Sequence, residues 1–132
     1  LGMGYRRVGI AFCVEMFREA EILGGVLKRF FEVVPVCCRV GSRPDEEHGT
    51  ASCNVIAQAE ALNAQGTELN VMVGLCVGCD LLFSAHSQAP ATTLFVKDKS
   101  LANNPVGALY SRYYLDDLMS QPATPKPQGG LS

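Results

Sequence analysis

The stretch that most constrains the fold is LNVMVGLCVGCD, residues 69–80. Its near-continuous Val, Leu and Met residues, without polar alternation, are typical of a strand that is covered on both faces, and such strands belong mainly to parallel α/β sheets. The helix-like segment DLLFSAHS follows at once, so we expect Cys76 and Cys79 at a strand-to-helix turn. In open parallel sheets, ligands bind at the carboxyl ends of the strands. This edge is therefore where we look for function.

The 132 residues are enough for one domain, which we place at residues 1–119, and the Pro/Gly-rich residues 120–132 predict a mobile tail. The net charge of -2 and the lack of a Lys/Arg cluster argue against a nucleic-acid or anionic-membrane partner. The sequence shows neither an apolar run long enough to span a membrane nor a signal peptide. We therefore expect a cytoplasmic protein, in which cysteines stay reduced.

Four strand-like segments alternate with four helix-like segments along the chain. We expect strands at residues 5–13, 32–40, 69–75 and 91–97, and helices beginning near residues 16, 53, 80 and 106. Residues 41–52 show neither the helical nor the strand spacing of apolar residues, and we expect them to form a loop over the carboxyl edge of the sheet. With right-handed crossovers, this order predicts a small parallel sheet in the strand order 2-1-3-4 with helices on both faces, a flavodoxin-like or Rossmann-like fold. The open edges of so small a sheet also make a homodimer plausible.

Five of the six cysteines are predicted to lie at this edge. Three of them are at the end of a predicted strand, and two are at the start of a predicted helix. We expect Cys13, Cys53, Cys76 and Cys79 to bind zinc or an iron-sulfur cluster, with Cys38 as a substitute ligand, since both centres use sets of four thiolates. His48 and Asp80 are candidates for supporting roles. Cys37 should face away from Cys38, since side chains alternate along a strand, and is expected to be a packing residue.

Other interpretations of the cysteines stay open. A thiol at a helix amino terminus, such as Cys76 or Cys79, could act in redox or nucleophilic chemistry, although no His or Lys flanks the pair. The C-x5-R spacing from Cys37 to Arg43 resembles a phosphatase loop, but Pro44 and an acidic loop follow it instead of a helix. The cysteines could also be core residues of a non-catalytic interaction domain.

Several segments resemble a known family. The segments GIAFC, FREAE, CNVIAQAEALN, GLCVGCD, APATTLFVKD and NNPVGALY are similar to the prokaryotic family called domain of unknown function 1847. The resemblance runs from about residue 5 to residue 114 and so covers nearly all of the expected domain.

The resemblance implies a metal-binding protein whose activity is not established. Family members commonly carry a further cysteine-rich segment before the first strand, which this sequence lacks. They also tend to have His at the position of Cys79. Since His and Cys are both zinc ligands, this exchange favours a metal site over a redox pair, although it is equally consistent with a position that tolerates change. The small-molecule ligand, if there is one, is not implied by the resemblance.

Overall fold

The computed structural model describes residues 2–41 and 53–120 of the chain. Its centre is a four-stranded, fully parallel sheet in the order β2-β1-β3-β4, as the sequence predicts. The register is regular between the first three strands, and the pairing of β3 with β4 shifts between Met72 and Leu75. Both central strands are buried, which explains why their sequences are apolar without alternation.

The elements follow one another as four β-α units. The strands are β1 (Arg7–Phe12), β2 (Glu32–Cys37), β3 (Leu69–Leu75) and β4 (Ala91–Val96), and the helices are η1 (a 3-10 turn, Val14–Met16), α1 (Phe17–Leu27), α2 (Val55–Ala64), α3 (Val77–His86), α4 (Gly107–Tyr110) and α5 (Arg112–Ser120).

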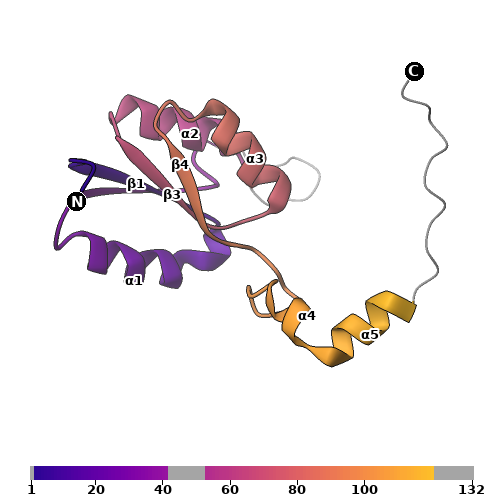
Figure 1. Cartoon of the computed structure of the whole chain (residues 1–132). Coiled ribbons are helices and arrows are strands. Elements are labelled where there is room, and N and C mark those ends of the chain that lie inside the picture. The colour runs from indigo at the N-terminus through magenta and orange to yellow at the C-terminus, as the bar shows by residue number, and fades with distance from the viewer. Residues whose placement is uncertain (1, 42–52, 121–132) are drawn as a thin grey trace, which may run out of the picture.

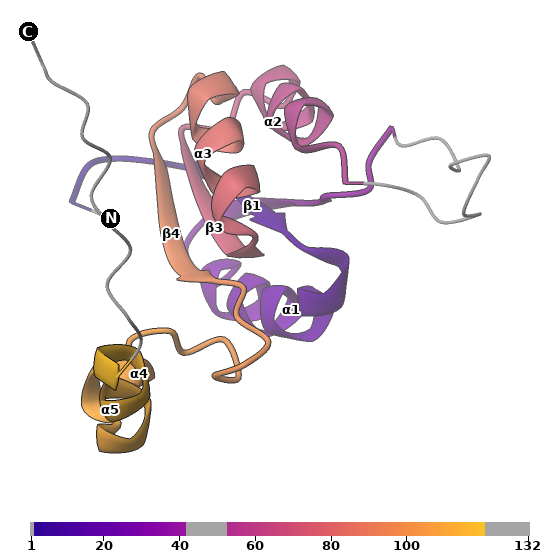
Figure 2. The same cartoon turned by 90° about the vertical axis from the view of Figure 1, so that its right-hand side faces the viewer.

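Helices cover the two faces of the sheet unequally (Figures 1 and 2). On one face α2 packs on β1 and β2, and α3 packs beside it on β3 and β4. On the other face α1 packs on β1 and β2. Ile10, Leu62 and Phe83, from β1, α2 and α3, have no exposed surface, so the core fills both sides of the sheet. The architecture is an α/β fold. It resembles Rossmann-type folds only in its short parallel sheet with helices on both faces.

Several element boundaries differ from the sequence-based expectations. β2 ends at Cys37, and α3 already begins at Val77, so that Cys79 lies inside the helix and Cys76 is its N-cap. The last helix is divided at Ser111, whose backbone is extended (φ -91°, ψ 114°), into α4 and α5. The predicted loop, apart from Gly41, and the predicted tail after Ser120 lie outside the described residues.

The two helices after β4 lie beyond the carboxyl edge of the sheet, and their main packing is on each other (Figure 1). Tyr110 and Tyr113 are each about four-fifths exposed, and Tyr114 is 38% exposed. These tyrosines therefore contribute little to the core of the domain. No helix in the described part of the chain is both long enough and apolar enough to cross a membrane.

Candidate functional site

The carboxyl edge of the sheet is held together by backbone hydrogen bonds just past the strand ends. The N–H of Cys13 donates to the carbonyl of Val73 (3.3 Å), and the N–H of Cys38 donates to the carbonyl of Phe12 (2.9 Å). The chain returns to this edge at Asn54, whose N–H donates to the carbonyl of Cys38 at 2.6 Å. The first residues after β1 and β2 and the residues before α2 are therefore fixed side by side.

Cys38 and Cys53 form one pair in this region. Their Sγ atoms are 3.6 Å apart, with Cys38 buried and Cys53 exposed. Asn54 caps α2, because its Oδ1 accepts from the N–H of Ala57, and this cap fixes the backbone next to Cys53. Burial raises the pKa of the Cys38 thiol, and with the smaller contributions of the neighbouring Cys53 and Cys13, against an opposing hydrogen bond from the backbone of Val14, the pKa reaches about 12. The Cys38 thiol is therefore protonated at neutral pH.

Cys76 and Cys79 come from the start of α3. Cys76 is exposed and accepts the N–H of Asp80 on its carbonyl at 2.8 Å, while Cys79 is partly buried against the core. Burial raises the pKa of Cys79, and the closeness of Cys76, Cys53 and Cys13 raises it further. Three other thiols thus lie near enough to oppose the ionisation of Cys79.

Cys13 lies next to a lysine that the sequence analysis overlooked. Lys97, the first residue after β4, places Nζ 3.5 Å from the Sγ of Cys13 and also pairs with Glu15. The carboxylate of Glu15 holds the pKa of Lys97 above its usual range, so the ammonium group stays charged. The signal for Lys97 was present in the sequence, since it ends a strand-like segment and so belongs at the same edge as the cysteines.

The structure thus brings together the five predicted cysteines, each at the end of a strand or the start of a helix. Within the described residues, however, no group of three or more His, Cys, Asp or Glu side chains is arranged to hold a metal ion. What the geometry shows is a cluster of thiols around one closely contacting pair.

The other sequence-predicted residues lie elsewhere or are not described. Cys37 faces α1, away from Cys38, as the alternation along β2 predicts. The carboxylate of Asp80 accepts from the hydroxyl of Thr93 and so ties α3 to β4. The ring of His86 contacts the carbonyl of Leu82 within α3, a structural role. His48 lies outside the described residues.

The glycines of the segment GLCVG have different environments. Gly74 has a positive φ of +63°, and a Cβ there would lie 2.4 Å from the Cγ of Met16, so this position requires glycine. At Gly78 a Cβ would meet nothing within 4 Å. Close packing therefore requires glycine at residue 74 but not at residue 78.

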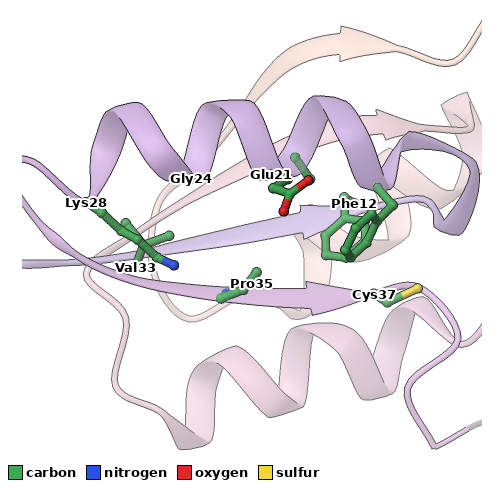
Figure 3. Close-up of a pocket in the computed structure, with 9 residues that line it drawn as sticks. Phe12, Glu21, Gly24, Lys28, Val33, Pro35 and Cys37 are labelled. Atoms are coloured by element: carbon green, nitrogen blue, oxygen red, sulfur yellow. The ribbon is translucent and has the colours of Figure 1, made fainter.

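A pocket of about 380 Å³ lies on the other face of the sheet, between α1 and β2 (Figure 3). Its walls are mainly apolar, with Phe12, Pro35 and Cys37 from the strands, and Glu21 and Lys28 from α1 supply its charges. This pocket could not be predicted from the sequence, because the helical periodicity of apolar residues does not show which flank of the helix is left uncovered.

The comparisons with known proteins agree with the resemblance noted in the sequence. Over 126 residues the chain is 45% identical to an uncharacterized protein of Methanocaldococcus jannaschii; the match takes in 89% of this chain and 65% of that relative. No solved structure matches the chain. The model of the family described as "Protein of unknown function (DUF1847)" matches residues 2–94. This chain therefore belongs to the DUF1847 family of proteins of unknown function.

Proposed function

We propose that the cysteine cluster at the carboxyl edge of the sheet binds zinc or an iron-sulfur cluster. The observation that carries the proposal is the convergence of Cys13, Cys38, Cys53, Cys76 and Cys79 from four separate parts of the chain. Cys13, Cys53, Cys76 and Cys79 would be the ligands, with Cys38 as the substitute.

A bound metal ion would change the ionisation of the clustered thiols. Cys79 resists ionisation because it is buried and because three other thiols are near, and two of these neighbours, Cys53 and Cys13, also oppose ionisation of Cys38. A metal ion reverses this balance, because it binds thiolates directly and lowers the pKa of each coordinating thiol.

The described side-chain positions do not form a ready site, so binding would require the thiols to turn toward a common centre. A cysteine side chain has a single rotatable bond to its sulfur, and its sulfur can therefore move while the backbone stays in place. The exposed Cys53 and Cys76 have the most room for this rotation.

Lys97 suits a site of this kind. Four thiolates around one Zn²⁺ carry a net charge of about -2, and a nearby ammonium group that donates to one sulfur offsets part of it. Lys97 lies at such a distance from Cys13, and its side chain is only 12% exposed, so solvent screens this interaction little.

The second candidate function is chemistry at a reactive thiol. Cys76 favours it, because its side chain is exposed at the N-cap of a ten-residue helix, where the helix dipole stabilises a thiolate. The raised pKa of Cys79 argues against the C-x-x-C pair acting as a dithiol in which Cys79 is the attacking thiolate.

The test is the metal and acid-labile sulfide content of the protein purified without oxygen, compared with Cys76→Ser and with the matched control Cys37→Ser. We expect near-stoichiometric metal in the wild type and in Cys37→Ser, and its loss in Cys76→Ser. Sulfide and visible absorption would assign an iron-sulfur cluster, and their absence zinc.

Metal-free protein with six reduced thiols would overturn the proposal for this chain. Rapid alkylation of Cys76 alone in that protein, measured by mass spectrometry with iodoacetamide, would then favour the thiol chemistry.

A further inference from the structure

Two of the clustered thiols are in direct contact with each other. The Sγ atoms of Cys38 and Cys53 lie 3.6 Å apart. A disulfide bond has a sulfur–sulfur length of about 2.05 Å, so these two atoms need to approach each other by only about 1.5 Å to be joined. Rotations about the Cα–Cβ bonds of the two side chains can cover this distance.

The backbone around this pair is held in place by hydrogen bonds. The N–H of Asn54, the residue after Cys53, donates to the carbonyl of Cys38 at 2.6 Å. Gln58, one turn further along α2, is fully buried, and its Nε2 donates to backbone carbonyls of β1 and β2 at 3.2 Å and 2.7 Å. These contacts fix the start of α2 against the ends of the two strands. The sulfurs therefore stay close together while their side chains rotate, as disulfide formation requires.

The two thiols differ in their access to solvent. Cys53 is exposed, whereas Cys38 is only 1% exposed. A reagent from solution can therefore reach the sulfur of Cys53 but not the sulfur of Cys38. This arrangement suits a thiol that reacts first and a buried neighbour that then displaces the group bound to it.

We propose that Cys38 and Cys53 form a disulfide bond by exchange with a low-molecular-weight disulfide. In the first step the sulfur of Cys53 attacks one sulfur of the reagent, the S–S bond of the reagent breaks, and one reagent thiol leaves with the proton of Cys53. In the second step the sulfur of Cys38 attacks the sulfur of Cys53, and the other reagent thiol leaves with the proton of Cys38. Two protein thiols are thus oxidised, and one reagent disulfide is reduced to two thiols.

The second step is favoured by the contact between the two sulfurs. Burial raises the pKa of Cys38, so its thiol is protonated at neutral pH and is by itself a weak nucleophile. Its sulfur already contacts the atom that it must attack, and well-placed groups within one molecule react as if their concentration were very high. We therefore expect the mixed disulfide on Cys53 to be converted to the protein disulfide and not to accumulate.

The disulfide would act as a switch for the cysteine cluster, and this consequence rests on the proposed function. Cys53 is one of the proposed metal ligands and Cys38 is the substitute, so the bond removes both from the cluster. The thiols that remain are Cys13, Cys76 and Cys79. Three thiols do not complete the set of four that zinc or an iron-sulfur cluster uses, so oxidation should release the metal.

The first test is peptide mapping of metal-free, reduced protein after treatment with oxidised glutathione and alkylation of the remaining thiols. Trypsin and a glutamyl endopeptidase together place Cys38, Cys53 and residues 69–80 on separate peptides. Cys37→Ser is both the background and the matched control, since Cys37 shares a peptide with Cys38 but lies on the other face of the sheet.

Mass spectrometry should show a peptide linked between Cys38 and Cys53 in the Cys37→Ser protein. When Cys38→Ser is added, the glutathione adduct should remain on Cys53. When Cys53→Ser is added instead, Cys38 should stay unmodified, because the reagent does not reach it. A glutathione adduct that persists on Cys53 while Cys38 is present would overturn the proposal, and so would linkage of Cys53 to a different cysteine.

The second test is the titration of Zn²⁺ into the reduced and the oxidised forms of the Cys37→Ser protein. Loss of a group that only supports a ligand weakens metal binding by about 10–100-fold, so loss of a ligand should weaken Zn²⁺ binding by more than about 100-fold. Equal affinity of the two forms would overturn the switch. A reduced form that does not bind Zn²⁺ would overturn zinc as the metal and the zinc switch with it, whereas the disulfide is decided by the peptide mapping alone.

Discussion

On one face of the sheet α2 and α3 lie side by side over all four strands, whereas on the other face α1 alone covers β1 and β2. Leu62 and Phe83 on the covered face have no exposed surface, and Cys38 is buried there as well. The other face keeps an open pocket and a row of exposed apolar residues on α1. The two faces therefore differ in how completely helices cover them, and the buried thiol of Cys38 lies on the more completely covered one.

The largest expected effect is on stability, and it differs between the two faces. Phe83 of α3 is fully buried, so Phe83→Ala should lower the free energy of unfolding by about 3–5 kcal/mol through lost contacts and the cavity left behind. Ile22 of α1 is 60% exposed, and Ile22→Ala should cost less than about 1 kcal/mol. Urea unfolding of the two variants, at a protein concentration at which the chain is monomeric, measures the difference. Equal losses would show that the open face is covered in the single chain.

The next effect distinguishes the adjacent cysteines Cys37 and Cys38, which lie on opposite faces. The pKa of Cys38 is about 12 in the folded chain, above the value of about 9 for an unfolded thiol. The unfolded chain therefore loses this proton first, and stability is lost as the pH rises from about 9 toward 12. One pH unit within this window corresponds to about 1.4 kcal/mol for one group, so we expect a loss on the order of 1 kcal/mol by pH 10.

Urea unfolding of metal-free, reduced protein between pH 7 and pH 10 measures this dependence. Cys38→Ala should make it shallower, and Cys37→Ala should leave it unchanged. Some slope should remain in Cys38→Ala, because the pKa of Cys79 is also raised. An unchanged slope in Cys38→Ala would show that this thiol is not the group that titrates.

The sequence was sufficient to predict the covered side of the molecule. The apolar run of β3 indicated a central strand, and the rule that crossovers are right-handed then gave the order 2-1-3-4 and brought the cysteines to one edge. These inferences depend only on the spacing of apolar residues along the chain and on the preferred right-handedness of crossovers. Both can be applied to a single sequence.

The open side could not be predicted in the same way. The spacing of Leu109, Tyr110 and Tyr113 indicates an apolar helix surface, but it does not indicate what covers that surface or that the helix breaks at Ser111. The arrangement of the thiols could not be predicted from the sequence either, because the rotamer of each cysteine at the edge depends on its neighbours in space.

The last expected effect concerns a polar group in the covered face. Asn70 lies within the apolar run of β3, is fully buried, and its Nδ2 donates to the Oγ of Ser87 at 2.8 Å. Ser87→Ala leaves this N–H without its acceptor, so we expect a loss of about 1–2 kcal/mol in the free energy of unfolding. Ser100→Ala, an exposed serine whose side chain makes no hydrogen bond within the described part of the chain, is the matched control and should be neutral. Urea unfolding measures both variants. If Ser87→Ala were as neutral as the control, water would have to reach the side chain of Asn70. The sheet face under α3 would then be less completely covered than the difference between the two faces implies.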